Sequence, residues 1–374
     1  HYNQTMKYIG SKDYSHSTVE KAGVIFTNLG TPEAPTASAL RKYLAEFLWD
    51  PRVVEFPRPL WWLILHLIIL RIRPARSAKT YAKIWTDQGS PLMKYTQAQV
   101  AAIRNKFSTL KLDHIEIDFA MRYGQPSIES VIKKFHDRYV TRLLIVPLYP
   151  QYSGSTTGST FDAVAEVLKK LRWMPELRFV QNYADDETYI FACAQQINKF
   201  WIENQKSEKL IFSFHGLPKR YLTAGDPYHC QCYKTARLIA EKLGLNETQW
   251  QLTFQSRFGR EEWLQPYTDK TLEKLPGQGV SSIDVFCPGF SADCVETLEE
   301  IDMLNREIFF DAGGKSFQYI PALNAEDAHI QAITELALKH MQGWEQLHTD
   351  YNEDDMAMQK MVSQQLARQL GADK

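Results

Sequence analysis

Short runs of β-branched and aromatic residues alternate along the chain with longer segments of helical periodicity. These runs predict eight strands, at 24–28, 115–121, 142–148, 177–180, 209–214, 250–254, 282–286 and 317–320. The segments between them predict helices near 36–48, 77–106, 126–138, 157–171, 186–204, 229–243, 266–274, 293–309 and 325–342. Strands that alternate with helices usually form parallel sheets with helices on both faces. The pattern therefore predicts an α/β fold.

The strands divide into two sets, which indicates two lobes. Prolines frame an aromatic turn at 147–152, and we place the boundary there, so that the lobes span 22–148 and 149–324. Residues 1–21 lack periodicity and predict a loosely held N-terminal extension. Residues 325–344 predict a helix that packs back on the first lobe, and residues 345–374 predict an appended polar tail with helical propensity.

One segment, residues 60–70, is apolar apart from His66, and four basic residues follow it: Arg71, Arg73, Arg76 and Lys79. Its eleven residues are fewer than the roughly 20 that a helix needs to cross a bilayer. Two interpretations remain open. The segment is a buried helix, or it is an exposed lip whose paired Trp61 and Trp62 meet a membrane surface or a flat apolar ligand.

Composition narrows the choice of partners. The chain has 374 residues, with 43 basic against 44 acidic side chains, so no overall charge favours nucleic acid. Five irregularly spaced cysteines do not make a disulfide framework, and no secretory pattern opens the chain. We therefore expect a protein of the reducing cytoplasm.

Two residues stand out as candidates for chemistry. His215 ends the strand-like run 209–214 and precedes Gly-Leu-Pro, while Glu296 follows the strand 282–286 and a Pro-Gly-Phe turn. Ligands of open α/β sheets bind at the carboxyl ends of the strands. An imidazole and a carboxylate at that edge can move protons or hold a metal ion.

An acidic stretch surrounds Glu296. Helical spacing places Glu296, Glu299 and Glu300 along one face, and Asp293 precedes them. For Glu299 we expect a solvated helix face. Together with His215, the other acids predict a route for a hydrated divalent cation.

Further strand-end residues predict a broad aromatic cleft with a cation that can hold a carboxylate. These are Arg122, Tyr123, Tyr149 and Trp263. Nucleotide sites are disfavoured, because 153–160 lacks the Gly-Lys-Ser/Thr ending of a P-loop and 28–32 lacks the GxGxxG spacing. A soft-metal site at His229, Cys230 and Cys232 stays open, since the Cys-x-Cys spacing alone does not complete a tetrahedral set.

Six motifs together resemble the ferrochelatases, which insert ferrous iron into a porphyrin to make haem. They are Asn-Leu-Gly-Thr-Pro at 28–32, Gly-Ser-Pro-Leu-Met at 89–93, Leu-Tyr-Pro-Gln-Tyr-Ser at 148–153, Ser-Phe-His-Gly-Leu-Pro at 213–218, Phe-Gln-Ser-Arg-Phe-Gly-Arg at 254–260, and the run from Cys287 to Glu300. The resemblance covers residues 22–342 and is greatest to the proteobacterial branch. It implies two Rossmann-like lobes, each a parallel sheet flanked by helices, with the porphyrin between them.

The resemblance also implies residue roles. His215 and Glu296 match the catalytic pair, and together with Glu300 and Asp293 they are expected to handle the metal. Residues 57–76 match an apolar lip that closes over the macrocycle and meets the membrane. The porphyrin-binding positions are expected to be Leu29, Trp61, Trp62, Arg122, Tyr123, Tyr149, Ser155, Trp263 and Phe290.

Three departures from the family pattern limit what the resemblance implies. Cys294 stands where many eukaryotic-type members carry a second histidine, and Leu304 replaces an acid that extends the carboxylate row in some members. Gly154 stands where cluster-bearing animal-type members have a cysteine, and the tail after 342 has none. Gly154 and the absence of cysteine from the tail argue against an iron–sulfur cluster.

The resulting prediction is an enzyme without a required cofactor, with protoporphyrin IX and Fe²⁺ as substrates and transient contact with a membrane surface. It would be cytoplasmic, peripheral at the inner membrane, and either a monomer or a homodimer. Which of His215 and Glu296 takes protons and which handles iron stays open. Two rivals remain: a sister chelatase that loads cobalt or nickel into a related tetrapyrrole, and a non-catalytic porphyrin carrier.

Overall fold

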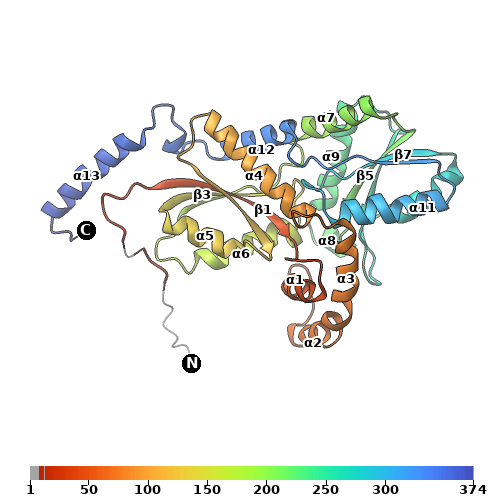
Figure 1. The fold of residues 1–374 in the computed structure, drawn as a ribbon, viewed down its shortest axis with the longest axis horizontal. Helices are drawn as coiled ribbons and strands as arrows, with labels where there is room; N and C mark the ends of the chain where they lie inside the picture. Colours follow the sequence, from red (N-terminus) through yellow and green to blue (C-terminus); the bar gives the residue numbers. More distant parts are fainter. Residues whose placement is uncertain (1–7, 12, 374) are drawn as a thin grey trace.

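The computed structural model describes residues 8–11 and 13–373 and contains two four-stranded parallel sheets (Figure 1). The first has the order β2-β1-β3-β4 and the second the order β6-β5-β7-β8. Their strands are β1 (Lys21–Gly30), β2 (Glu116–Tyr123), β3 (Val140–Pro147), β4 (Glu176–Phe179), β5 (Lys209–His215), β6 (Trp250–Gln255), β7 (Ser282–Phe286) and β8 (Ser316–Tyr319). All eight predicted strands are confirmed, and so is the α/β class.

Helices connect the strands and cover both faces of each sheet. The α-helices are α1 (Ala37–Trp49), α2 (Arg58–Ile64), α3 (Leu70–Ile84), α4 (Pro91–Thr109), α5 (Ile128–Asp137), α6 (Ser159–Leu168), α7 (Glu187–Glu203), α8 (Lys219–Thr223), α9 (Tyr228–Lys242), α10 (Thr268–Lys274), α11 (Arg306–Asp311), α12 (Asp327–His340) and α13 (Glu353–Gln369). Three π-helical segments lie at η1 (Leu65–Ile69), η2 (Gly154–Gly158) and η4 (Glu296–Asn305), and two 3₁₀ turns lie at η3 (Pro276–Gln278) and η5 (Glu345–Leu347).

One apolar core joins the two lobes. Val24 and Phe26 of β1 share it with Phe212 and Phe214 of β5, whereas Ile25 points to the opposite face of its sheet. This alternation follows from the two-residue period of a strand. Helix α12 packs against α4 of the first lobe and α7 of the second. The predicted return of the C-terminal helix to the first lobe is therefore present, and both sheets are buried on both faces.

The boundary predicted at residue 148 does not coincide with the end of the first sheet. Strand β4 pairs with β3 from Arg142↔Glu176 to Ile145↔Phe179, so the first sheet continues to residue 179. Prolines at 147 and 150 end β3 and shape the loop that follows it. They do not end the lobe, because the chain crosses through α6 and returns as the edge strand.

The single helix predicted at 77–106 is two helices. Helix α3 ends at Ile84, and α4 begins at Pro91 after Gly89, whose φ is +98°. The Ser90 side chain accepts a hydrogen bond from the backbone N–H of Met93, and Pro91 occupies the first helical position. This combination is a strong helix start, so the break was encoded locally.

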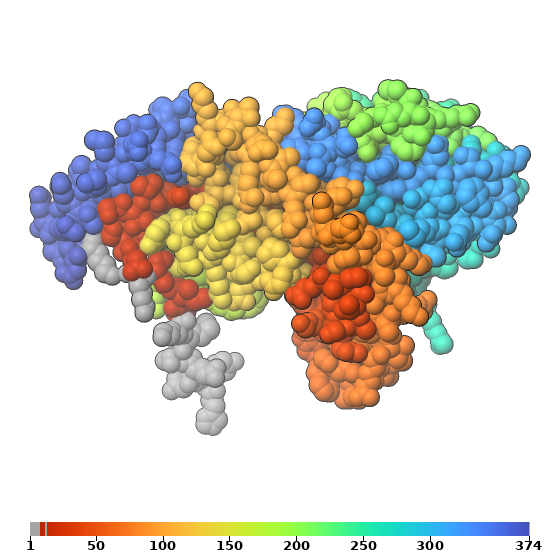
Figure 2. Space-filling view, in the orientation of Figure 1, coloured from red at the N-terminus to blue at the C-terminus, as the bar shows by residue number. Residues whose placement is uncertain are grey.

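The apolar segment after residue 57 forms an exposed projection, and we use the name lip for residues 57–76 (Figure 2). Leu65 and Leu70 anchor it in a cluster with Leu40 and Leu44 of α1. Its exposed large apolar residues are Leu60, Trp62, Leu63, Leu67, Ile68 and Ile72. Of the two open interpretations, the structure therefore favours the exposed lip over the buried helix.

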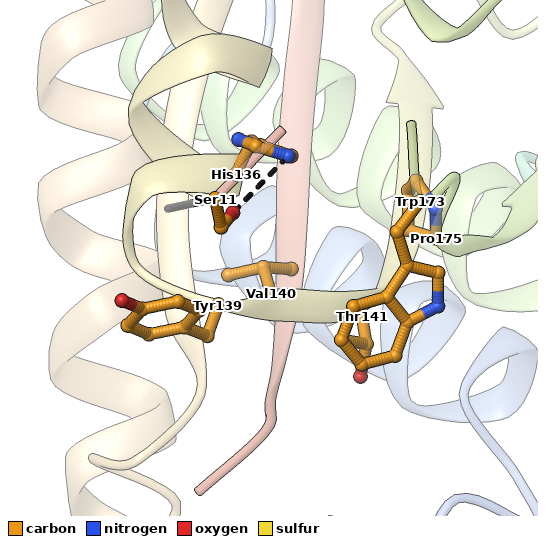
Figure 3. A pocket seen from close by; sticks show the side chains of 7 residues that line it. All are labelled: Ser11, His136, Tyr139, Val140, Thr141, Trp173 and Pro175. Carbon is orange, nitrogen blue, oxygen red and sulfur yellow. Dashed lines mark hydrogen bonds between the residues drawn. The ribbon is translucent and has the colours of Figure 1, made fainter. Parts of the chain in front are cut away.

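The described part of the N-terminal extension is held against the first lobe. The backbone N–H of Ile9 donates to Lys170 O at 2.9 Å, and the N–H of Arg172 donates to Ile9 O at 2.7 Å. Ser11 lies 3.4 Å from Nε2 of His136 at the edge of a cavity of about 20 Å³ (Figure 3). The expectation of a loosely held extension does not apply to residues 8–11, and for residues 1–7 and 12 it falls outside the described residues.

Candidate active site

His215 is the last residue of β5 and pairs in register with Gln255, the last residue of β6. Its Nδ1 lies 2.6 Å from the carbonyl oxygen of Gly216. A carbonyl oxygen only accepts, so Nδ1 carries a hydrogen and donates it. In the neutral imidazole, Nε2 then keeps its lone pair. The backbone thus fixes the tautomer that accepts a proton or binds a cation through Nε2.

The strand ends at His215 because the next residue must approach its neighbour closely. The N–H of Gly216 donates to Gln255 O at 2.7 Å, and a Cβ at position 216 would lie 2.7 Å from that same oxygen. The same hypothetical Cβ would lie 3.2 Å from the Trp263 ring. Glycine at 216 therefore allows β5, β6 and Trp263 to pack closely beside His215.

Glu300 is held beside this histidine by three donors. Ser256 donates from its backbone N–H at 2.7 Å and from its hydroxyl at 2.5 Å, and Gln255 Nε2 donates at 3.2 Å. Burial raises the pKa of Glu300 and the charge of Glu296 adds to the rise, while Ser256, His215 and Gln255 oppose it. Glu300 thus interacts electrostatically with both members of the predicted pair.

Glu296 faces the first lobe. Burial raises the pKa of Tyr81 on α3 far above its ordinary value, and the carboxylate of Glu296 is the next largest cause. The same carboxylate contributes to the raised pKa of Tyr43 on α1, after burial and Tyr81. The Cys294 thiol also bonds to it. Glu296 therefore lies where the second lobe meets the helices behind the lip.

The acidic stripe does not have the α-helical geometry that its spacing predicts, because residues 296–305 form a π-helix. π-Helical segments are rare and occur often at functional sites. Glu299 turns away from the pair and forms a 2.7 Å ion pair with Lys83 of α3, with 8% of its side chain exposed. The prediction of a solvated face for Glu299 is therefore wrong.

Asp293 is occupied by protein donors. Its carboxylate accepts from the hydroxyls of Tyr319 at 2.6 Å and Thr297 at 2.9 Å, and from the Asn324 amide at 2.8 Å. Only 3% of the residue is exposed. These bonds fasten the start of η4 to the loop after β8, which argues against Asp293 as a metal ligand.

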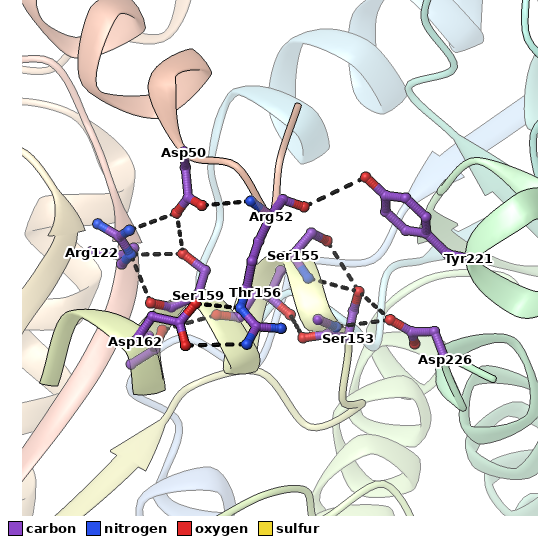
Figure 4. Close-up of polar contacts among 12 residues, drawn as sticks. Asp50, Arg52, Arg122, Ser153, Ser155, Thr156, Ser159, Asp162, Tyr221 and Asp226 are labelled. Atoms are coloured by element: carbon purple, nitrogen blue, oxygen red, sulfur yellow. Dashed lines mark hydrogen bonds and ion pairs between the residues drawn. The ribbon is translucent and has the colours of Figure 1, made fainter. Parts of the chain in front are cut away.

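Arg122 and Tyr123 belong to a buried polar network centred on Asp50. Figure 4 shows Asp50 with Arg122, Ser159 and Arg52. Asp50 accepts from Arg122 at 2.5 Å, Tyr123 at 2.8 Å, Ser159 at 2.5 Å and the backbone N–H of Arg52 at 2.8 Å. Burial acts to raise the pKa of Asp50, but these donors outweigh it and hold that pKa below its ordinary value.

Tyr123 has no exposed surface, so the predicted direct contact with a porphyrin is wrong for this side chain. It is fixed from the other side by Gly30, whose φ is +111° and whose Cβ, if present, would lie 1.8 Å from the carbonyl oxygen of Tyr123. Arg122 is partly exposed, but two bonds to Ser159 and one to Asp50 engage its guanidinium. Both residues shape the first-lobe wall.

Ser155 belongs to a second polar cluster, which also contains Ser153, Gly154 and Asp226. Its hydroxyl is 3.0 Å from that of Ser153, which in turn donates to Asp226 at 3.0 Å (Figure 4). The backbone N–H of Gly154 donates to the same carboxylate at 2.8 Å. These bonds start η2, and they link the first lobe to the loop before α9.

Except for Trp62, the remaining predicted porphyrin positions are half-buried and apolar or aromatic. Leu29 and Trp61 pack in the cluster behind the lip, whereas Phe290 packs beside Leu92 and Cys294. The hydroxyl of Tyr149 and the indole N–H of Trp263 are buried without a hydrogen-bond partner in the described part of the chain. Such orphaned groups are uncommon and mark places where a ligand atom can complete the bonding.

The two tryptophans of the lip differ in role. The indole N–H of Trp61 donates to Leu48 O at 2.7 Å, so Trp61 ties the lip to the end of α1. Trp62 is 47% exposed, and its ring lies 4.8 Å from that of His66 in a tilted arrangement. Trp61 thus anchors the lip, whereas Trp62 lies exposed on its surface.

Metal ligands do not cluster in the described residues, 8–11 and 13–373, in any group of three or more His, Cys, Asp or Glu side chains. The predicted four-residue metal set is therefore not assembled. On α9, Cys232 is buried against Tyr228 while Cys230 is exposed, and the ring of His229 stacks on Phe254. Those three side chains do not converge on one point.

Residue-by-residue reasoning on the sequence missed Asp50, Gln255 and Ser256. Gln255 and Ser256 lie inside the motif at 254–260, directly after a strand, which is the signal that could have identified them. Ser256 also has a φ of +64°, a strained backbone for a residue with a side chain. Such outliers concentrate at functional sites.

Comparison with known proteins identifies the family that has this arrangement. The family model of ferrochelatases matches residues 21–341. The chain belongs to the ferrochelatase family. It is 54% identical to a ferrochelatase of Pseudoalteromonas atlantica over 369 residues, covering 99% of this chain and 100% of that one. It is 58% identical to a ferrochelatase of Idiomarina loihiensis over 339 residues, covering 91% and 93%.

Among solved structures, SirB from Bacillus subtilis with Fe³⁺ aligns with a TM-score of 0.49 and 10% identity, covering 86% of this chain and 96% of SirB. Ferrochelatases insert iron into protoporphyrin to make haem. The predicted family is confirmed over nearly the whole chain.

Proposed function

We propose that this ferrochelatase inserts Fe²⁺ into protoporphyrin IX between its two lobes, at His215 and Glu296. The observation that carries this proposal is the fixed tautomer of His215, whose Nε2 keeps a lone pair, together with the interaction of Glu300 with both His215 and Glu296. Metallation needs groups that remove two pyrrole protons and replace water around the incoming cation. A histidine and two acids are sufficient for both tasks.

The proton balance sets the tasks. Each porphyrin loses its two N–H protons, the resulting dianion binds iron through all four nitrogens, and the iron stays in the +2 oxidation state. His215 accepts one proton at Nε2, because Nδ1 is already committed to Gly216. The carboxylate of Glu296 accepts the other or holds the cation during transfer. Glu300, held by Ser256 and Gln255, keeps the approach acidic and hydrated.

The half-buried aromatic and apolar residues around this pair are proposed to hold the macrocycle. Leu29, Tyr149, Trp263 and Phe290 supply the contacts. Pressure from the two walls distorts the ring and exposes the nitrogen lone pairs, at a cost of about 1–5 kcal/mol drawn from remote binding. No resident cofactor is part of this proposal.

An anaerobic assay tests the proposal against its rivals. Addition of Fe²⁺ and protoporphyrin IX is expected to quench porphyrin fluorescence catalytically, over many turnovers per chain. A carrier would quench at most one equivalent, and a sister chelatase would prefer cobalt or nickel and a different tetrapyrrole. Either of those outcomes would overturn the assignment.

Substitution of Ser256 by alanine is expected to move the acid limb of the pH–activity profile to higher pH. The serine hydroxyl opposes the rise that burial causes in the pKa of Glu300, so its loss raises that pKa further. Glu300 acts as a carboxylate, which means that activity then disappears at a higher pH. The measurement is kcat/KM between pH 5 and 9.

The matched variant is Glu300→Gln, which removes the titrating group and is expected to flatten this limb at reduced activity. An unshifted limb in Ser256→Ala would show that Glu300 does not control activity at low pH.

The lip is proposed to rest on a membrane surface, with the chain otherwise in the cytoplasm. Among residues 8–11 and 13–373, none of the helices combines the length and apolar character that a membrane crossing requires. The lip instead presents exposed Trp62, Leu67 and Ile68 beside basic α3, a pattern typical of interfacial segments. Contact of the lip with the membrane surface would let an apolar substrate pass from the membrane directly to the site.

Substitution of Trp62 by serine is expected to weaken binding to phospholipid vesicles by about tenfold, because burial of a large apolar side chain contributes roughly 1.5–3 kcal/mol. Vesicle sedimentation with intact enzyme provides the measurement. Trp173→Ser is the control, since Trp173 is 45% exposed on the first lobe, away from the lip. Equal binding by both variants would contradict membrane contact through the lip.

A further inference from the structure

Helix α13 lies at one end of the molecule, and none of its residues is buried (Figures 1 and 2). Few contacts hold it in place. Asn352 caps its start by accepting from the N–H groups of Asp354 and Asp355, and Lys360 forms a 3.0 Å ion pair with Glu20. The ring of Tyr351 stacks on His114 just before it. The helix is thus held in a defined place but contributes nothing to the core.

One face of α13 is apolar and turned away from the body of the protein. Met358, Val362, Leu366 and the C-cap residue Leu370 follow one another at intervals of four residues, and Met361 lies beside Val362, so the five side chains form one broad stripe along the helix. Their exposed fractions run from 55% to 90%. An apolar stripe of this length on an otherwise polar helix is typical of a surface that binds another helix.

The charges of α13 disfavour a membrane as the occupant of this stripe. Interfacial helices carry a polar face rich in lysine and arginine. The described part of α13 has two basic residues, Lys360 and Arg368, against the acids Glu353, Asp354 and Asp355. Lys360 is already paired with Glu20. Moreover, the lip projects from a different part of the molecule (Figure 2).

The same charges favour a second copy of this chain, placed antiparallel. Acids occupy the first turn of α13 and Arg368 occupies its last turn. Asp354 and Arg368 each lie seven residues, two helical turns, from Met361. An antiparallel pair centred on Met361 therefore sets Asp354 of each copy opposite Arg368 of the other, with the apolar stripes in contact.

We propose that α13 is a homotypic docking helix, through which two copies of the enzyme associate by antiparallel pairing of the stripe from Met358 to Leu370. The interface is isologous, because each copy contributes the same surface. Two helices of this length bury a small area, and interfaces below about 1,200 Å² belong to weak complexes. The dimer is therefore concentration-dependent, and each lip stays accessible.

Sedimentation velocity of the full chain over a range of concentrations tests this proposal. The wild-type chain is expected to pass from monomer to dimer, and Met361→Glu is expected to raise the dimer dissociation constant more than about tenfold, because a charge would be buried without a partner. Ile202→Glu is the control. Ile202 is 85% exposed on α7, and its substitution is expected to leave the dimer unchanged.

Charge reversal tests the register. Asp354→Arg or Arg368→Asp alone is expected to weaken the dimer by up to about fivefold, and the double variant is expected to restore it, because both cross-pairs re-form. Iron insertion by all variants should stay at the wild-type level.

A chain that stays monomeric throughout, or a dimer that Met361→Glu leaves intact, would overturn the proposal. The proposal would also fail if Met361→Glu abolished binding of a monomeric chain to vesicles of anionic phospholipid, since the occupant would then be a membrane.

Discussion

Replacement of His215 by alanine is expected to lower kcat for iron insertion by about 100- to 10,000-fold, the range for loss of a positioned acid–base group. The bond from Nδ1 to Gly216 O fixes the accepting nitrogen, and alanine has no group that can accept a proton in its place. The KM for porphyrin should change little, because the walls of the site remain. Steady-state kinetics with saturating Fe²⁺ give both values.

His348 supplies a matched control for this substitution. It is exposed in the tail, so His348→Ala removes the same chemical group far from the reacting atoms and should leave kcat unchanged. Near-normal turnover of His215→Ala at saturating iron would remove both roles that the residue could have, proton acceptor and cation carrier. A selective rise in the KM for iron would favour the second role.

Replacement of Asp50 by alanine is expected to lower the free energy of unfolding by about 3–5 kcal/mol, because it leaves the largely buried Arg122 guanidinium, 18% exposed, without its carboxylate. Tyr123 and Ser159 would lose an acceptor at the same time. Urea unfolding followed by circular dichroism measures the loss.

Asp162 provides the comparison for Asp50. It pairs with Arg52 in the same region, but both side chains are more than a third exposed, and exposed pairs contribute about 1 kcal/mol or less. A similarly small loss in Asp50→Ala would contradict the central role of Asp50 in the network.

The pH dependence of stability provides a second test of Asp50. The pKa of Asp50 is lowered in the folded state, so its stabilisation is present above the pKa of the unfolded state and is lost as the pH falls through the folded value. Asp50→Asn should therefore narrow the stability difference from wild type as the pH decreases. A difference that stays constant down to pH 3 would contradict this assignment.

The strands and the position of His215 could be predicted because their signals are local. A continuous run of buried residues marks β5, and Gly216 with Pro218 marks its end. The lip was equally visible as a run of apolar residues too short to cross a bilayer. Family resemblance then supplied the substrate, which no single residue specifies.

The partners of the acidic residues could not be predicted, because they lie far away in the sequence. Glu299 meets Lys83, and Asp293 meets Tyr319 and Asn324, only after both lobes have folded. A spacing of three and four residues assumes an α-helix, and the π-helix at 296–305 changes which side chains share a face. Similarly, β4 pairs with β3 in the first sheet after a crossover through α6. The proline-rich turn at 147–152 indicated a lobe boundary at that point, so the crossover was not predicted.

A crystal structure of this ferrochelatase with protoporphyrin IX bound tests the central claim most directly. The account predicts a macrocycle between the two lobes, with Nε2 of His215 and the carboxylate of Glu296 facing its pyrrole nitrogens, and with Tyr149 and Trp263 in contact with it. A macrocycle bound elsewhere, or one that reaches only one member of the pair, would contradict the account.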